Sequence, residues 1–171
     1  MVLVIMTRSR DVSDAAMNPT VRHARLDDLD TIMEIERKSF RVPWEYTIYL
    51  RICLQEGRVR SSDEGMLFMD VLEKEKKIIG FAVWETNPLS KKGHILNLAI
   101  IEEERSNGYG RMLIRHVQES LKNTGMASCN LEVRESNSLA RSLYETCGYV
   151  ISDRLAGYYF DEDAIEYSRN L

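Results

Sequence analysis

One stretch of the sequence, LNLAIIEEERSNGYGRMLIRHVQ at residues 96–118, most restricts how the chain can fold. Its first six residues are mostly apolar, as in a buried strand. Gly108 and Gly110 follow, and Leu113 and Val117 then repeat at helical spacing. A strand that turns through glycines into an amphipathic helix is typical of an α/β domain. The free backbone N–H groups at such a helix start also favour a bound anion, so this turn is a candidate binding site.

Periodicity along the rest of the chain predicts further elements of the same class. The predicted strands cover residues 20–25, 66–72, 78–85, 94–101, 128–134, 149–154 and 164–169. The predicted helices cover residues 26–40, 44–56, 110–123 and 138–147, and residues 58–65 are predicted to form a polar loop. We therefore expect one α/β domain at residues 20–171, with a mixed sheet covered by helices, after an N-terminal extension at residues 1–19.

Composition limits which partners the chain is expected to have. Lysine and arginine total 23 against 27 acidic residues, a net charge of -4, so no direct nucleic-acid binding is expected. The cysteines Cys53, Cys129 and Cys147 have no metal-ligand spacing, and no metal is implied. The opening MVLVIM is too short for a membrane span or a secretory signal. We expect a cytoplasmic protein with no membrane association.

The glycine turn allows several readings. A dinucleotide-binding fold requires a third glycine where Leu113 stands, and a nucleotide-hydrolase loop requires a Gly-Lys-Ser/Thr sequence that is absent here. Both are disfavoured. A turn that needs glycine only for its backbone geometry remains open. So does a phosphate-binding loop of the form R-x-x-G-x-G, which runs from Arg105 to Gly110.

Two segments resemble one known family. The R-x-x-G-x-G loop resembles the acetyl-CoA pyrophosphate loop of the GNAT superfamily of N-acetyltransferases. The segment NLEVRESNSLARSLYETCGYV, residues 130–150, resembles the strand-helix-strand region of ribosomal-protein-alanine and other protein N-terminal acetyltransferases. The resemblance implies a mostly antiparallel sheet and acetyl-CoA as cofactor. The cofactor-binding residues that it implies are Leu98, Ala99, Ile100, Arg105, Ser106, Asn107, Gly108, Tyr109, Gly110, Arg111 and Asn137.

Acetyl transfer to an α-amine needs a base and an acid. The α-amine has a pKa near 8, so it must lose a proton before it attacks a thioester, and the departing thiolate benefits from a proton donor. By pattern alone Glu132 is an outward-facing charge in a strand, Tyr144 a core aromatic and His94 a solvated strand end. The resemblance implies Glu132 as general base and Tyr144 as proton donor, with His94 as a second candidate that shares proton removal.

Two further segments are candidates for the acceptor site. By resemblance, SFRVPWEYTIYL at residues 39–50 forms one wall of that site, although its apolar residues also suit a local hydrophobic cluster. An adjacent tyrosine pair lies in the predicted loop before the last strand. It matches tyrosines that, in N-terminal acetyltransferases, bind the backbone of the substrate. The substrate-binding candidates are Phe40, Pro43, Trp44, Glu45, Tyr158 and Tyr159.

The leading hypothesis from the sequence is transfer of acetyl from acetyl-CoA to the α-amino group of protein N-termini, by direct attack in a ternary complex. Two alternatives remain open: a small-molecule amine or lysine acetyltransferase of the same fold, and a non-catalytic acyl-CoA-binding module. Protein or peptide N-termini are the expected partners. The sequence leaves open a ribosome or auxiliary subunit as a partner, the preferred first residue and the oligomeric state.

Overall fold

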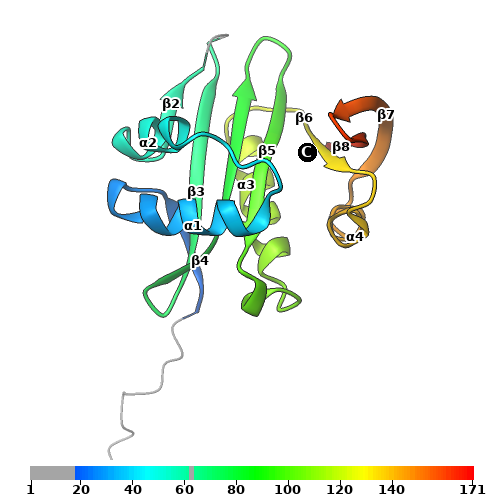
Figure 1. The fold of residues 1–171 in the computed structure, drawn as a ribbon. Helices are drawn as coiled ribbons and strands as arrows, with labels where there is room; N and C mark the ends of the chain where they lie inside the picture. Colours follow the sequence, from blue (N-terminus) through cyan, green and yellow to red (C-terminus); the bar gives the residue numbers. More distant parts are fainter. Residues whose placement is uncertain (1–17, 62–63) are drawn as a thin grey trace, which may run out of the picture.

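The computed structural model describes residues 18–61 and 64–171, and shows one α/β domain built on a single sheet (Figure 1). Residues 1–17 of the predicted N-terminal extension lie outside the described residues. The strands are β1 (Thr20–His23), β2 (Arg58–Arg60), β3 (Met66–Lys74), β4 (Lys77–Asn87), β5 (Lys92–Ile100), β6 (Ser128–Arg134), β7 (Val150–Tyr159) and β8 (Glu162–Asn170). The helices are α1 (Leu29–Ser39), α2 (Tyr46–Leu54), α3 (Tyr109–Asn123) and α4 (Ser138–Thr146), with 3-10 turns η1 (Leu26–Asp28) and η2 (Glu102–Glu104).

The sheet is mixed but mostly antiparallel, as expected. Within the described residues its eight strands lie in the order β1-β3-β4-β5-β6-β8-β7, and β2 also pairs with β3. Strands β5 and β6 are parallel, and the other pairs are antiparallel. Strands β5 and β6 therefore form the one parallel junction of the described sheet, and they lie at its centre.

Helices cover both faces of the sheet because the strands alternate their apolar side chains. On β4, Phe81 and Val83 face α1 and α2, whereas Ala82 and Trp84 face the core that contains α3. Figure 1 shows α1 and α2 in front of the sheet and α3 behind it. Helix α4 packs in the same core as α3. A strand with apolar side chains on both faces fits the centre of a sheet between two helical layers.

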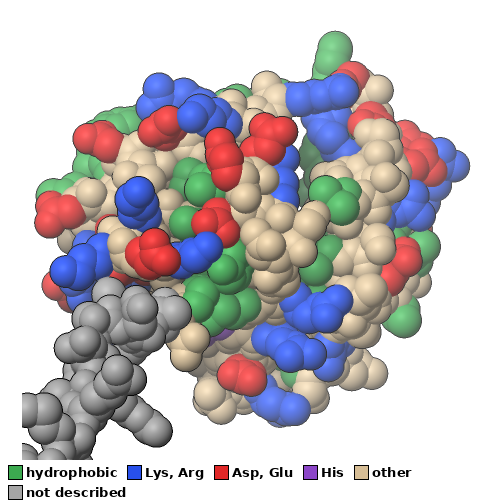
Figure 2. Space-filling model, turned by 90° about the horizontal axis from the view of Figure 1, so that it is seen from below, with side chains coloured by type: hydrophobic (Ala, Val, Ile, Leu, Met, Phe, Trp, Pro, Cys, Tyr) green, Lys and Arg blue, Asp and Glu red, His purple; other side chains and the backbone are tan. Residues whose placement is uncertain are grey.

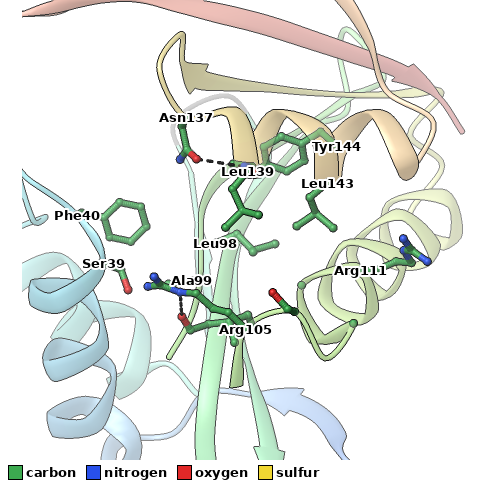
Figure 3. A pocket seen from close by; sticks show the side chains of 15 residues that line it. Ser39, Phe40, Leu98, Ala99, Arg105, Arg111, Asn137, Leu139, Leu143 and Tyr144 are labelled. Carbon is green, nitrogen blue, oxygen red and sulfur yellow. Dashed lines mark hydrogen bonds between the residues drawn. The ribbon is translucent and has the colours of Figure 1, made fainter. Parts of the chain in front are cut away.

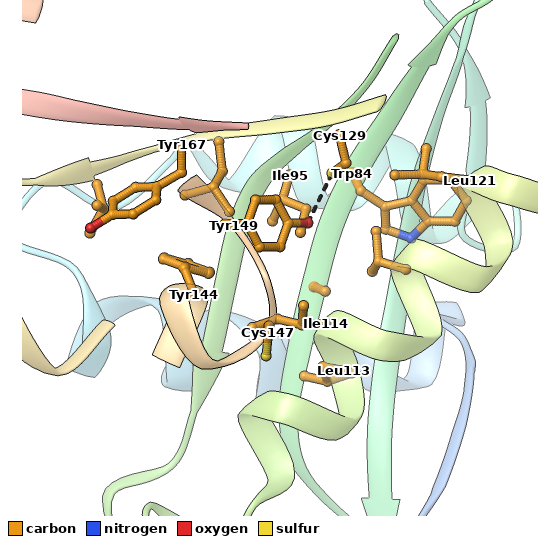
Figure 4. Close-up of a cluster of buried hydrophobic side chains, with 14 of the residues drawn as sticks. Trp84, Ile95, Leu113, Ile114, Leu121, Cys129, Tyr144, Cys147, Tyr149 and Tyr167 are labelled. Carbon is orange, nitrogen blue, oxygen red and sulfur yellow. Dashed lines mark hydrogen bonds between the residues drawn. The ribbon is translucent and has the colours of Figure 1, made fainter. Parts of the chain in front are cut away.

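The core on the α3 side is the larger of the two hydrophobic clusters (Figure 4). Helix α3 contributes Leu113, Ile114, Val117 and Leu121, all fully buried and repeating at the i, i+1, i+4, i+8 positions of one helix face. Each such side chain stabilises the fold by about 1.5–3 kcal/mol relative to its exposed state. This burial fixes α3, and hence the glycine turn at its start, against the sheet.

Strand β5 contains a bulge and then separates from β6. Ile95 lies opposite Trp84 and Asn97 lies opposite Val83, so Leu96 is the additional residue in β5. The pairing of β5 with β6 extends only from Lys92 to Ile95. Beyond Ile95, in the described part of the chain, this edge of β5 has no strand partner. Its backbone groups are therefore free to bind another extended chain.

The structure corrects three details of the sequence-based prediction. The predicted polar loop contains strand β2, in which Val59 is buried between two exposed arginines and pairs with β3. Three residues are too few for a periodic pattern to show. Tyr158 and Tyr159 lie at the end of β7 rather than in a loop. The spacing of Ile48 and Ile52 in the predicted helix at residues 44–56 favours both on its buried side, but Ile48 is 39% exposed, and Tyr49 is buried next to Ile52 instead.

The surface carries mixed charge. Figure 2 shows Lys and Arg side chains interspersed with Asp and Glu side chains on the face of the molecule seen from below. Among the residues that the structure describes, no helix is both long enough and apolar enough to cross a membrane. The same residues contain no cluster of three or more His, Cys, Asp or Glu arranged to hold a metal ion.

Candidate active site

Two neighbouring cavities open where β5 and β6 separate. The first, of about 510 Å³, extends to the glycine turn, and we call it the loop cavity. The second, of about 430 Å³, extends to β6 and the end of β7, and we call it the sheet cavity. The residues that line both cavities are Ser39, Phe40, Leu98, Asn137, Ala140 and Tyr144. The two cavities therefore adjoin each other at these residues, so ligands bound in the two cavities would lie side by side.

The glycine turn forms the far wall of the loop cavity (Figure 3). Gly108 begins α3 with a φ of 84°, a left-handed conformation, and a Cβ built there would meet no atom within 4 Å. The space in front of the helix start is thus open to a ligand. At Gly110 a Cβ would lie 2.9 Å from Leu143 Cδ2, so this glycine also permits the close approach of α4.

Two arginines of the turn line the loop cavity. Arg105 Nε donates to the carbonyl oxygen of Ile100 at 3.0 Å, which ties the turn to the end of β5 (Figure 3). Arg111 lies one turn into α3, also on the cavity wall. With the free N–H groups of the helix start, these two cations make this end of the cavity suited to a multiply charged anion such as a pyrophosphate.

Not every predicted cofactor-binding residue lines the loop cavity. Leu98, Ala99, Ile100, Ser106 and Asn137 do. Asn137 also caps α4, because its Oδ1 accepts from the Ala140 N–H at 3.1 Å.

Asn107 and Tyr109 face other partners instead. Asn107 Nδ2 donates to the carbonyl oxygen of Glu104 at 3.4 Å, and the Tyr109 ring lies 5.4 Å from Lys74 Nζ. Neither side chain lines the loop cavity.

Glu132 and His94 meet at the sheet cavity. Glu132 lines the cavity, and its Oε2 lies 2.7 Å from His94 Nε2, while His94 Nδ1 lies 3.8 Å from Glu85 Oε1. His94 is not part of the cavity lining, so it lies behind Glu132. Burial alone would lower the pKa of His94, but the hydrogen bond to Glu132 and the nearby carboxylates outweigh burial and raise this pKa. The pair can therefore take up a proton from a group in the cavity.

Tyr144 occupies the wall between the two cavities. It is 8% exposed and packs at ring distances of 6.0 Å from Tyr149 and 6.2 Å from Tyr167, so it is a core aromatic as well as a lining residue. Within the described residues its hydroxyl has no hydrogen-bond partner. Burial raises the pKa of Tyr144, which keeps the phenol protonated at neutral pH and available as a donor.

The acceptor-wall candidates divide into lining and exposed residues. Phe40 and Trp44 line the sheet cavity, whereas Pro43 and Glu45 are exposed and lie outside its lining. Of the tyrosine pair, Tyr159 lines the cavity, and its hydroxyl lies 3.5 Å from the backbone oxygen of Glu132.

Tyr158 stands against this wall from outside. Its ring packs at right angles to Tyr159 with centroids 5.1 Å apart, and the side chain is half-exposed. It is not part of the cavity lining. Tyr159 therefore forms part of the cavity wall, and Tyr158 packs against its ring. Burial and the interaction with the Glu132 carboxylate raise the pKa of Tyr158.

Several lining residues of the sheet cavity were not predicted from the sequence, and the buried acid Glu36 is one of them. Glu36 of α1 is fully buried, and its carboxylate accepts from the Trp44 backbone N–H at 2.8 Å and from Asn97 Nδ2 at 3.1 Å. Burial raises the pKa of Glu36. The sequence held a signal: Glu36 follows Leu29, Ile32 and Met33 on the apolar face of the helix, where an acid needs a reason to be buried.

Together these features define a class of protein. A split sheet holds two joined cavities, one extending to a glycine turn suited to an anion and the other to a partly buried carboxylate with a histidine beside it. This arrangement suits an enzyme that transfers a group from an anionic carrier to a second substrate.

Comparison with known proteins identifies the family. Residues 29–149 match the acetyltransferase (GNAT) family. An N-alpha-acetyltransferase of Saccharolobus solfataricus is 30% identical over 170 residues, covering 92% of this chain and 96% of its own. The crystal structure of the ribosomal-protein-S18-alanine N-acetyltransferase from Escherichia coli has a TM-score of 0.74 at 25% identity, covering 89% of this chain and 93% of its own. The chain belongs to the GNAT family of acetyltransferases.

Acetyl-CoA is the cofactor of this family, and the loop cavity fits it. The fold is shared with Arabidopsis thaliana NAA60, whose structure contains acetyl-CoA, at a TM-score of 0.74 and 18% identity, covering 90% of this chain and 98% of that one. In the present chain, the open space before Gly108 and the two arginines suit the pyrophosphate, and the free edge of β5 suits the amide-containing arm.

Proposed function

We propose that the protein transfers acetyl from acetyl-CoA to the α-amino group of protein N-termini, by direct attack in a ternary complex. The observation that carries this proposal is the junction of the two cavities, where Glu132 and Tyr144 face the same space from β6 and α4. The relative named N-alpha-acetyltransferase supports the choice of acceptor.

The loop cavity holds the carrier. Leu98 to Ile100 offer backbone groups along the free edge of β5, and Arg105, Arg111 and the N–H groups around Gly108 bind the pyrophosphate. When bound, acetyl-CoA supplies an activated acetyl thioester. With the carrier in the loop cavity, the thioester would lie at the wall shared by the two cavities, which contains Tyr144.

Glu132 removes the proton from the acceptor amine. An α-ammonium has a pKa near 8, and a carboxylate at the cavity wall takes its proton directly or through one water. His94, hydrogen-bonded behind Glu132, has a raised pKa and accepts that proton in turn. The neutral amine then attacks the thioester carbonyl, the C–N bond forms and the C–S bond breaks.

Tyr144 protonates the departing thiolate. Its phenol is kept neutral by burial, and its hydroxyl has no competing partner among the described residues. The proton moves from the Tyr144 oxygen to the sulfur. The nitrogen loses its second proton as the amide forms, and this proton returns to the Tyr144 oxygen. The first amine proton, held by the Glu132–His94 pair, leaves to solvent. The proposed acid and base thus lie on two elements, α4 and β6, that line the same cavity.

The sheet cavity binds the peptide. The buried carboxylate of Glu36 in its wall gives the cavity a negative charge that favours an ammonium ion, and Tyr159 forms part of the wall along which the peptide backbone lies in this proposal. A small polyamine lacks that backbone. A lysine ε-amine has a pKa of about 10.4, so much less of it is neutral at pH 7 than of an α-amine.

The test uses the purified protein with acetyl-CoA and three acceptor sets, read by mass spectrometry. The sets are peptides with free N-termini varied at the first two residues, N-terminally blocked peptides with an internal lysine, and spermidine. We expect the unblocked peptides to be acetylated fastest. Faster acetylation of spermidine or of an internal lysine would replace this proposal with the corresponding alternative.

Variants test the two catalytic assignments. Glu132→Gln and Tyr144→Phe should each lower kcat by about 100- to 10,000-fold while acetyl-CoA affinity is retained. Glu135→Gln and Tyr149→Phe are matched controls, because Glu135 pairs with Arg154 and the Tyr149 hydroxyl contacts Cys129, both outside the two cavities. A wild-type rate in both test variants would overturn these two assignments and leave His94 as the candidate base. No turnover by the wild-type protein with any of the acceptors would favour a non-catalytic acyl-CoA-binding module.

A further inference from the structure

The sheet cavity has charges of opposite sign at its two ends. Glu36 and Glu132 are its deep carboxylates, with Glu36 fully buried and the Glu132 side chain 14% exposed. Arg134 and Arg41 also line it, and their side chains are 20% and 71% exposed. The negative groups therefore lie deep and the positive groups lie toward the rim.

One carboxylate holds both rim arginines. Asp161 lies in the turn between β7 and β8, where its Oδ2 is 3.0 Å from Arg41 Nη1 and its Oδ1 is 2.7 Å from Arg134 Nη1. Asp161 itself is exposed and is not part of the cavity lining. It thus bridges the segment between α1 and α2 to β6 from outside the cavity.

The two arginines differ in how firmly they are held. Arg134 has a second partner, Glu162 Oε2 at 3.3 Å, and its guanidinium lies 4.3 Å above the Tyr159 ring. Among the described residues, Asp161 is the one carboxylate that pairs with Arg41. Exposed pairs of this kind contribute about 0–1 kcal/mol, so another carboxylate can replace Asp161 at little cost.

The spacing matches a short stretch of peptide. Glu132 and Arg134 are two residues apart on one face of β6, which corresponds to about 7 Å. An extended peptide covers the same distance in about two residues. A chain whose amine reaches Glu132 therefore brings the side chains of its first three residues near the rim arginines.

We propose that the sheet cavity selects protein N-termini that carry an acidic side chain within the first three residues, and that this side chain takes the place of Asp161 between Arg41 and Arg134. The inference rests on the proposed function. The exchange replaces one carboxylate with another, so both guanidinium groups stay neutralised, while the α-ammonium goes to Glu36 and Glu132. The cavity thus complements an acceptor with its positive end first and its negative side chain behind it.

Peptides that differ in one group test the inference. A neutral N-terminal sequence is prepared with Glu, Gln or Lys at position one, two or three, and kcat/KM is measured at low and high salt. We expect Glu to exceed Gln by about tenfold at one of these positions, Lys to be poorest there, and the preference to shrink at high salt.

Substitutions locate the preference. Arg41→Gln should bring the Glu-to-Gln ratio toward one, and Arg41→Lys should keep part of it. Arg51→Gln is the charge-matched control, because Arg51 is exposed on α2 and lines neither cavity, and it should retain the full ratio. Asp161→Asn removes the internal competitor, so it should raise kcat/KM for the Glu peptide relative to the Gln peptide.

The failures are distinguishable. If wild-type protein acetylates Gln and Glu peptides equally at all three positions, the inference is overturned and the proposed function stands. Equal losses on both peptides in Asp161→Asn would mean that Asp161 only fastens the hairpin, which also overturns it. If no peptide N-terminus is acetylated while spermidine or lysine is, the proposed function fails and the inference falls with it.

Discussion

All three histidines of the chain touch a carboxylate, but in two different settings. His23 of β1 and His116 of α3 both contact Asp70, at 2.5 Å and 3.2 Å. His94 of β5 contacts Glu132 at 2.7 Å. The residue types are nearly the same in the two clusters, so their positions and partners must account for any difference in role.

Asp70 is saturated with donors. It is fully buried in β3, and besides the two imidazoles the Trp84 indole N–H donates to its Oδ2 at 2.7 Å. Burial alone would raise the pKa of Asp70, but the hydrogen bonds from His116, His23 and Trp84 outweigh burial and hold this pKa well below its usual range. Asp70 lines neither the loop cavity nor the sheet cavity.

Glu132 contacts one imidazole, and its side chain also borders the sheet cavity. Besides His94, the Tyr158 side chain interacts with this carboxylate, but Glu132 keeps some exposed surface. A histidine–carboxylate contact therefore indicates proton transfer only where the carboxylate keeps access to a substrate. A carboxylate whose lone pairs are all used, as in Asp70, stabilises the fold instead.

The largest expected effect is on stability. Asp70→Asn should lower the free energy of unfolding by about 3 kcal/mol, because it removes a buried charge and turns an acceptor of three donors into a group that donates as well. The two histidines are partly exposed and can turn to water, but the Trp84 N–H cannot. Denaturant unfolding at pH 7 measures the change.

The activity of the same variant sharpens the contrast. Under conditions where Asp70→Asn is folded, this variant should keep the wild-type kcat. Glu132→Gln should instead keep the wild-type free energy of unfolding and lose kcat. If Asp70→Asn is as stable as wild type, or if it loses kcat while fully folded, Asp70 is not the structural member of the comparison.

The motif-bearing residues could be predicted from the sequence. The turn at Gly108, the strand residue Glu132 and Tyr144 lie within short segments whose order and spacing carry the information. The helices and most strands also follow from local periodicity, because each buries one continuous face.

The long-range contacts could not be predicted in this way. Asn97 reaches Glu36 because a bulge at Leu96 turns it toward α1, and a bulge depends on the partner strand. In the sequence, Asp70 is a single acid within the apolar segment MLFMDVL. The groups that donate hydrogen bonds to it come from residues 14 to 47 positions away. Local patterns identify elements, whereas contacts between distant elements decide which polar residue is structural.

The second largest expected effect is the loss, at low pH, of the contribution of Asp70 to the free energy of unfolding. The pKa of Asp70 is lower in the folded than in the unfolded state, so its contribution is fully present above about pH 4 and is lost as the pH falls toward the folded value. The stability difference between wild type and Asp70→Asn should therefore shrink from pH 5 to pH 3. A difference that grows over this range would contradict the assignment.

A matched pair of histidine substitutions compares the clusters directly. His94→Gln keeps a hydrogen-bonding side chain beside Glu132 but removes the proton acceptor, so kcat should fall by about tenfold, less than for Glu132 itself because His94 acts through it. His23→Gln lies in the structural cluster and should leave kcat unchanged. Single-turnover acetylation of a peptide measures both. Equal kcat values for the two variants would remove the distinction between the clusters.

The smallest effect concerns the pH dependence of the reaction. Glu85 faces His94 Nδ1 at 3.8 Å and is one of the carboxylates that raise the pKa of His94. Glu85→Gln removes that negative charge, so the pKa of His94 should fall and the acidic limb of the kcat/KM profile should move to lower pH. Glu34 is an exposed acid on α1 that pairs with Lys38, so Glu34→Gln is the control and should leave the limb in place.

Salt gives a second check. Because Glu85 is one-third exposed, added salt should make the difference in limb position between wild type and Glu85→Gln smaller. A limb that moves to higher pH, or that moves equally in both variants, would mean that the profile reports the net charge of the protein rather than the Glu132–His94 pair.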